Sequence, residues 1–196
     1  MLKYLLASAA LVGGATTAHA ATFTFQSMLD AAQSTTGTTS TATGMASISV
    51  DDDDETIDFS LSVDGLSLDG LNDAFVDGAN AALGPIHIHD GDAGLTGPVA
   101  IPFVFDTSAY MDTATGFQVN VVGLEYSAAV AISGFPESFE DFLSGLRSKE
   151  YYINIHSDAN PGGEIRGQIS AVPLPASSLM LLAALGGFAA MRRKAS

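Results

Sequence analysis

Three histidines are the best candidates for chemistry in this 196-residue chain. His87 and His89 are separated by one residue, and His156 lies about 70 residues further on; the fourth histidine, His19, is near the N-terminus. Neutral imidazole is a good ligand for zinc and copper, and it needs no deprotonation at neutral pH. Three imidazoles on neighbouring strands would therefore suit a copper or zinc ion, with water in an open position.

Charged residues beside these histidines have two interpretations. Asp90 or Asp158 would orient a ring nitrogen from a second layer around a metal. Glu164 and Arg166 share one face of a strand and would form an ion pair that stabilises the fold. The histidines also have a structural interpretation, in which the 87/89 pair caps a strand end and hydrogen-bonds to nearby backbone. The sequence leaves both interpretations open.

The other motifs exclude several kinds of site. Asp51 to Glu55 is a run of five carboxylates that repel one another, which predicts a solvated turn. Asp90 to Gly94 lacks the remaining oxygen ligands and the distal glutamate of a calcium loop. The sequence has no Gly-x-Ser-x-Gly elbow, phosphate loop or cysteine, so hydrolase chemistry by those routes is excluded.

Alternating apolar and polar residues predict the strands that position the histidines. Residues 46–50 and 57–63 form a hairpin with one buried face around the acidic turn, and further strands are predicted over 86–89, 99–105, 117–122, 151–156 and 165–170. Alternate side chains of a strand share a face, so His87 and His89 project together while Ile86 and Ile88 face the core. In the same way Tyr152, Asn154 and His156 share one face.

Short strands separated by Gly, Pro and Asp predict an all-β fold, an antiparallel Greek-key β-sandwich or barrel. One short helix is predicted to start at Pro136-Glu137 and to end near Lys149, because apolar residues recur between them at helical spacing. The Ser/Thr/Gly stretch over 34–44 has few apolar side chains and is predicted to be a linker or loose edge. Without cysteine, stability must come from the core.

The N-terminus has the pattern of a secretory signal peptide over residues 1–20. Lys3 is followed by an apolar stretch from Tyr4 to Val12 and by small residues that end in Ala18-His19-Ala20. A positive charge, a short apolar core and an A-x-A exit predict cleavage by signal peptidase after Ala20.

The C-terminus, residues 172–196, has the pattern of a sorting signal. Val172-Pro173-Leu174-Pro175-Ala176 precedes an apolar run that ends at Met191 and a basic triplet, 192–194. A helix over 176–191 would span roughly 24 Å, a marginal fit to a hydrocarbon core of about 30 Å, and the basic triplet would stay cytoplasmic. The arrangement resembles the VPLPA variant of the PEP-CTERM signals of Gram-negative bacteria. That resemblance implies processing by an exosortase-type peptidase; the alternative is an uncut tail anchor.

Removing both ends makes the charge extreme. Three basic residues remain against all 22 acidic ones, a net charge of −19. Such a domain repels phosphate backbones and anionic lipid heads, which excludes nucleic acid as a partner. Divalent cations and basic partners are favoured.

The two histidine-containing segments resemble a known family. The segments are HIHDGDAGLTGPV at 87–99 and YYINIHSDANPGGEIRGQI at 151–169. Together they resemble the CHRD domain, named from chordin, over roughly Phe23 to Ile169; a proline-containing segment expected after the first strand is replaced by the Thr-rich stretch. The resemblance implies that residues 21–171 form one β-sandwich of an extracellular module. With the sorting signal, it predicts a non-enzymatic protein of the cell envelope, outer surface or extracellular matrix, transiently anchored in the inner membrane.

The histidine pattern has a looser similarity to copper-zinc superoxide dismutase. That enzyme has an H-x-H strand and a later strand-terminal histidine, and Arg166 would correspond to its anion-guiding arginine. Its zinc loop, bridging histidine and disulfide have no equivalent here, and the negative charge opposes an anionic substrate. Three hypotheses therefore stand: a matrix or envelope protein, a copper- or zinc-binding module, and a copper redox enzyme acting on superoxide.

Overall fold

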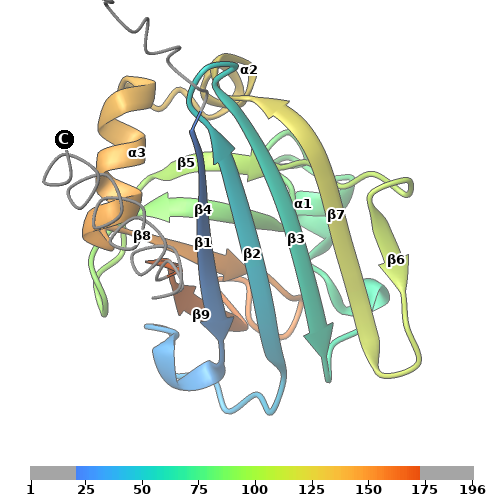
Figure 1. Cartoon of the computed structure of the whole chain (residues 1–196). Helices are drawn as coiled ribbons and strands as arrows, with labels where there is room; N and C mark the ends of the chain where they lie inside the picture. The colour runs from blue at the N-terminus through green and yellow to red at the C-terminus, as the bar shows by residue number, and fades with distance from the viewer. Residues whose placement is uncertain (1–20, 173–196) are drawn as a thin grey trace, which may run out of the picture.

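The computed structural model describes residues 21–172, which form two antiparallel sheets packed face to face (Figure 1). The predicted signal peptide with its cut after Ala20, the motif residues Pro173 to Ala176 and the predicted membrane helix lie outside the described residues. The sheets have the orders β10-β1-β2-β3-β7-β6 and β5-β4-β8-β9. The all-β sandwich predicted from the sequence is confirmed.

The strands of the two sheets cross one another in Figure 1 rather than running side by side. The six-stranded sheet contains β1 (Thr22–Leu29), β2 (Thr43–Asp51), β3 (Thr56–Asp64), β6 (Tyr110–Asp112), β7 (Gly116–Glu125) and β10 (Ser170–Ala171). The four-stranded sheet contains β4 (Ile86–Asp90), β5 (Val99–Phe103), β8 (Tyr151–Ile155) and β9 (Ile165–Gln168). The helices are α1 (Asp73–Val76), α2 (Tyr126–Ser133) and α3 (Phe139–Ser148).

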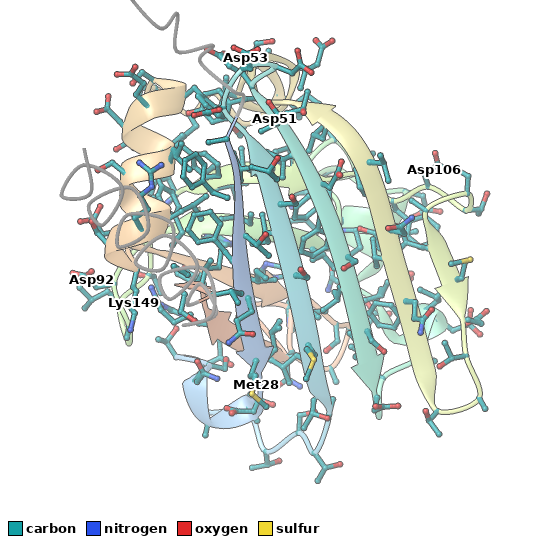
Figure 2. The ribbon with its side chains drawn as sticks, viewed as in Figure 1. Met28, Asp51, Asp53, Asp92, Asp106 and Lys149 are labelled. Carbon is teal, nitrogen blue, oxygen red and sulfur yellow. The ribbon has the colours of Figure 1, made fainter. Side chains whose placement is uncertain are left out.

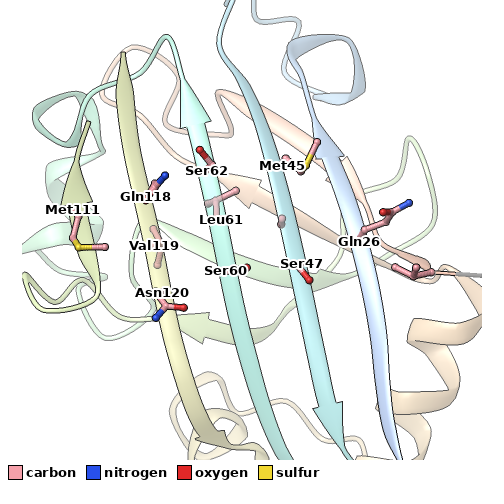
Figure 3. Close-up of a pocket in the computed structure, with 12 residues that line it drawn as sticks. Gln26, Met45, Ser47, Ser60, Leu61, Ser62, Met111, Gln118, Val119 and Asn120 are labelled. Atoms are coloured by element: carbon pink, nitrogen blue, oxygen red, sulfur yellow. The ribbon is translucent and has the colours of Figure 1, made fainter. Parts of the chain in front are cut away.

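The six-stranded sheet has one buried face and one open face. In β2 and β3 the inward apolar residues, such as Ile48 and Phe59, are at most 3% exposed, while the residues between them face outward. The outer face has uncharged side chains at its centre, where the polar Gln26, Ser47 and Asn120 lie with the exposed Met45 and Met111 (Figure 3). This is the alternation that the sequence predicts for a strand with one side in solvent.

The acidic run forms the predicted solvated turn between β2 and β3. The side chain of Asp51 accepts hydrogen bonds from the backbone N–H groups of Asp53 and Asp54. Figure 2 shows Asp51 and Asp53 at the end of this hairpin, among other acidic side chains at the periphery. These bonds set the turn, and the other carboxylates reach into solvent.

The predicted helix is α3, but it begins later than Pro136. Ser138 is its N-cap and accepts from the N–H of Asp141, and it ends where Lys149 adopts a left-handed conformation. The prediction of a single helix was incomplete. α1 has only four residues, and α2 is apolar over most of its length, so neither shows a clear helical period.

The prediction of a linker or loose edge over 34–44 is correct in part, because residues 34–42 connect elements without helix or strand but are held in place. The hydroxyls of Ser34 and Thr36 donate to the carbonyl of Gly163, and Ala42 is 2% exposed. Thr43 already belongs to β2. Hydroxyl hydrogen bonds, rather than the apolar contacts that the sequence lacks, anchor this stretch.

The four-stranded sheet is covered on both faces. All five residues of β8 are buried, although Tyr152 and Asn154 point away from the sandwich core. Loops before and after its strands contact this outer side, including residues 91–97 and 157–164. Within residues 21–172, no helix is long and apolar enough to cross a membrane.

Candidate functional site

Two neighbouring strands bring the three histidines together on the covered side of the four-stranded sheet. β4 carries His87 and His89, and His156 follows the last residue of β8. His89 lies opposite Tyr152, and the N–H of His156 donates to the carbonyl of Pro85, which extends the pairing. One nitrogen from each ring lies within 4.8 Å of the others. The predicted juxtaposition of the histidines is thus present in the structure.

Backbone carbonyls orient all three rings through their Nδ1 atoms. The pairs are His87 with Gly84 at 3.1 Å, His89 with Gly97 at 2.8 Å, and His156 with Pro161 at 2.6 Å. A carbonyl oxygen only accepts hydrogen bonds, so each Nδ1 carries the proton. In a neutral ring the Nε2 atom then keeps a free lone pair.

The Nε2 atoms converge with few donors to satisfy them. Those of His87 and His156 are 2.8 Å apart, a distance at which two lone pairs repel unless a cation lies between them. The Nε2 of His89 is buried and has no hydrogen-bond partner among residues 21–172. The amide nitrogen of Asn154 is 3.1 Å from the Nε2 of His156 and also donates to the carbonyl of Gly162. One lone pair of the three therefore has a donor within the described chain.

Burial keeps the three rings neutral at pH 7. Desolvation, with added repulsion from the other two rings, lowers the pKa of His87 well below its usual value. Desolvation also lowers the pKa of His89 to about 4, although its hydrogen bond with Gly97 acts in the opposite direction. The pKa of His156 is lowered for the same main reason. Neutral imidazoles with free Nε2 atoms are the form that binds transition metals.

Aromatic rings form the walls of the cluster. Phe75 of α1 stacks on His156, with ring centroids 4.6 Å apart. Tyr152 lies nearly parallel to His89 at 4.8 Å, and the guanidinium carbon of Arg166 is 3.2 Å from the centroid of the tyrosine ring. Guanidinium, phenol and imidazole thus form one layered stack. The stack fixes the plane of His89.

Arg166 positions a loop instead of making the predicted ion pair. It is 3% exposed, and its guanidinium donates to the carbonyls of Asp92 and Leu95. These bonds hold the loop that supplies Gly97 to His89. A guanidinium turned toward carbonyls and a ring is not placed to guide an anion, so the similarity to superoxide dismutase gains no support here.

Glu164 has its own partners and also acts on a loop. The residue is 7% exposed, and its carboxylate accepts hydrogen bonds from Ser157, at 2.6 Å, and from Asn160. Burial alone would raise its pKa, but hydrogen bonds from Ser157, Ser40 and Asn160 outweigh burial and lower the pKa. The carboxylate fixes the turn over 157–163, whose carbonyls orient His156 and Asn154.

The second-layer role predicted for Asp90 or Asp158 is taken by the three carbonyls. The carboxylate of Asp158 accepts from the N–H of Asp73, the first residue of α1, and so positions the helix that carries Phe75. Burial and neighbouring acidic groups raise the pKa of Asp90, and no hydrogen bond joins its carboxyl to an imidazole of the described chain. Neither aspartate orients a ring.

The sequence did not reveal Phe75 or the orienting carbonyls. Any residue has a carbonyl, so residue type gives no signal. Gly97 offers an indirect one, because a Cβ atom there would lie 1.4 Å from the carbonyl oxygen of Asp90. This close approach to Asp90 explains why position 97 is a glycine, and it also brings the carbonyl of Gly97 to His89.

The fold and the cluster define an all-β sandwich module with a buried group of three imidazoles. The CHRD domain model matches residues 25–169, most of the chain, and the chain therefore belongs to the CHRD family. Domains of this family are typically extracellular modules. No curated protein and no solved structure matches the chain.

Proposed function

We propose that this chain is an exported CHRD module that binds one copper or zinc ion through the Nε2 atoms of His87, His89 and His156. The observation that carries the proposal is the common orientation of the rings. Each Nδ1 is turned to a carbonyl, so three lone pairs converge, and the buried Nε2 of His89 lacks a partner among the described residues. Native proteins seldom leave a buried polar atom unsatisfied without a functional reason.

The nitrogen separations fit a metal after small side-chain shifts. Three ligands at about 2.0 Å from one ion, arranged trigonally, are roughly 3.5 Å apart. The separation of 2.8 Å between His87 and His156 and the limit of 4.8 Å for any pair bracket this value. The amide of Asn154 would turn from His156 and keep its bond to Gly162.

Metal analysis of the exported protein, purified without chelator, tests the proposal. We expect one equivalent of copper or zinc, and its loss in a His87→Ala, His89→Ala, His156→Ala variant. A Ser47→Ala, Ser60→Ala, Ser62→Ala variant changes three residues on the outer face of the other sheet and should keep the metal. Absence of stoichiometric metal, or equal binding by the histidine variant, would overturn the proposal.

We also propose that both ends of the chain direct it to the cell envelope of a Gram-negative bacterium. Signal peptidase would cut after Ala20, and an exosortase-type peptidase would process the Val172 to Ala176 motif after transient anchoring in the inner membrane. Supporting observations are that β10 is the edge strand beside β1 and that Val172 is 39% exposed. Displayed at the surface or in the extracellular matrix, the module would have a binding or structural role.

Substitution of the motif prolines tests the sorting proposal. The proposed signal would need extended backbone ahead of the predicted helix, which Pro173 and Pro175 would favour, so a double Pro→Ala variant should accumulate unprocessed in the membrane fraction. A Ser177→Ala, Ser178→Ala variant is the matched control. Normal processing and localisation of the proline variant would show that the pentapeptide is not the sorting element.

A further inference from the structure

We propose that the His87–His89–His156 site selects a monovalent copper ion, Cu⁺, over divalent zinc or copper. This inference rests on the proposed metal binding and specifies its ligand. Ion selectivity at the site depends on the positive charge of Arg166 and on the lack, among residues 21–172, of a carboxylate directed to the cluster.

Within residues 21–172, the groups that hydrogen-bond to or stack on the three rings carry no negative charge. They are the carbonyls of Gly84, Gly97 and Pro161, the amide of Asn154, and the aromatic rings of Phe75 and Tyr152. Three neutral imidazoles add no charge of their own. A bound ion would therefore keep its full charge in a buried site, and the Born cost of burying an ion grows with the square of its charge. A divalent ion pays about four times the cost of a monovalent one.

Two carboxylates of the segment that contains His156 are engaged elsewhere. Glu164 accepts from Ser157 and Asn160, and Asp158 accepts from the backbone of Asp73. Zinc sites usually gain a fourth ligand, often an anionic side chain or water. Here no described carboxylate is directed to the cluster. Cu⁺ is d¹⁰ like Zn²⁺ but carries half the charge, and three nitrogen ligands are enough for it.

Arg166 adds a permanent positive charge behind the site. Its guanidinium covers the face of Tyr152, whose ring stacks on His89. The Coulomb repulsion of this charge is twice as large for a divalent ion as for a monovalent one. The acidic surface attracts both ions, but its exposed charges are screened over about 8 Å at physiological ionic strength, whereas the buried guanidinium is screened less. The local charge therefore decides selectivity.

Competition titrations of the exported, metal-free protein test the inference. Cu⁺ is titrated anaerobically against a colorimetric Cu⁺ chelator, with Ag⁺ as a redox-inert monovalent probe, and Zn²⁺ and Cu²⁺ are titrated against chelators of their own. We expect one equivalent of Cu⁺ to bind, Ag⁺ to displace it, and both divalent ions to bind more weakly. Tighter binding of Zn²⁺ or Cu²⁺ would overturn the selectivity while leaving the metal-binding proposal intact. Binding of none of these ions would overturn both.

An Arg166→Met variant tests the charge effect through the ratio of the two affinities. Methionine keeps an apolar contact with Tyr152 and removes the charge; it also removes the bonds to Asp92 and Leu95, a loss that acts on both ions alike. Because the repulsion doubles with ionic charge, the affinity for Zn²⁺ should rise about tenfold relative to that for Cu⁺. Arg166→Lys should restore the wild-type ratio, and Arg147→Met, which removes an exposed arginine, should leave it unchanged. Equal changes for the two ions would contradict the charge argument, and the wild-type titration decides the selectivity even if the methionine variant fails to fold.

Discussion

Two asparagines with nearly the same local sequence have opposite environments in the two sheets. Asn120 lies between Val119 and Val121 in β7, and Asn154 lies between Ile153 and Ile155 in β8. Asn120 is exposed on the open face of the six-stranded sheet, where it borders a shallow depression of about 510 Å³ (Figure 3). Asn154 is 6% exposed and hydrogen-bonds to the histidine cluster.

The difference lies in what covers each sheet. The strand period decides only which side chains turn away from the sandwich core, and it does so equally well in both sheets. The residues that turn outward from β4, β8 and β9 are then enclosed by loops and α1. Six of the eight buried polar side chains among residues 21–172 accordingly lie on or beside one sheet: His87, Asn154, His156, Ser157, Glu164 and Arg166. The other two are Ser27 on β1 and Asn72 before α1. Three matched pairs of substitutions test whether burial under the loops, rather than residue type, decides how much a polar side chain contributes to the free energy of unfolding.

The largest contrast should be between Glu164 and Glu125. Glu164→Gln weakens charge-assisted hydrogen bonds from Ser157 and Asn160 and places an NH₂ donor against them. We expect a loss of about 2–4 kcal/mol in the free energy of unfolding at pH 7. Glu125→Gln, at the exposed end of β7, should change stability by less than about 0.5 kcal/mol. Urea unfolding of both variants measures the difference.

The effect at Glu164 should depend on pH in a defined direction. Its pKa is lower in the folded protein than its ordinary value of 4.5, so the unfolded chain binds the proton more readily. The stabilisation is complete above pH 4.5 and is lost as pH falls through the folded pKa. The difference between wild type and Glu164→Gln should therefore shrink below pH 4.5. A difference that stays constant down to pH 3 would show that the carboxylate charge is not what holds the turn.

Much of the fold could be predicted from the sequence, because the six-stranded sheet presents one face to solvent. Residues 46–50 and 57–63 alternate strictly, and both were predicted as a hairpin. The edge strand β6 and the helix α1 were not predicted, since three or four residues are too few to show a period, and α2 was missed because it is apolar over most of its length. The prediction that the stretch over 34–44 is loose failed because its hydroxyls bond to Gly163, a partner far away in the chain.

The candidate site could be predicted by residue type but not by contact. The strand period of two predicted that His87 and His89 share one face. The similar pattern of the two histidine-containing segments predicted that His156 lies on a neighbouring strand. The sequence could not show that Gly84, Gly97 and Pro161 orient the rings, because carbonyls leave no mark on residue type. It also paired Glu164 with Arg166, two residues apart. The loops that fold over the sheet offer each of them closer partners, and loop placement is a property of the whole fold.

The second contrast compares two arginines that each cover an aromatic ring. Arg166 is buried over Tyr152 and donates to two carbonyls, whereas Arg147 is exposed and lies 4.1 Å from the ring centroid of Phe23. Arg166→Met leaves the carbonyls of Asp92 and Leu95 without these donors and should cost roughly 2–3 kcal/mol. Arg147→Met should cost about 0.5–1 kcal/mol, the value of an exposed cation–π contact. Similar losses for the two variants in thermal or urea unfolding would show that the contact with the aromatic ring, and not burial under the loops, accounts for most of the stabilisation.

The smallest and most direct contrast returns to the two asparagines. Asn154→Ala removes the donor to the Nε2 of His156 and the donor to Gly162, and we expect a loss of about 1–2 kcal/mol in the metal-free protein. Asn120→Ala should change stability by less than about 0.5 kcal/mol, because the exposed Asn120 side chain is solvated by water in the folded and unfolded protein alike. Metal should narrow the gap if it binds as proposed, since an ion on the histidines would displace the amide from His156 in the wild type as well. Unfolding of both variants without metal therefore measures how much burial by the covering loops adds to the loss at Asn154. Unfolding with one equivalent of Cu⁺ shows whether the site is occupied. A gap that metal leaves unchanged would mean that the Asn154 amide stays on His156 and that this nitrogen is not a ligand.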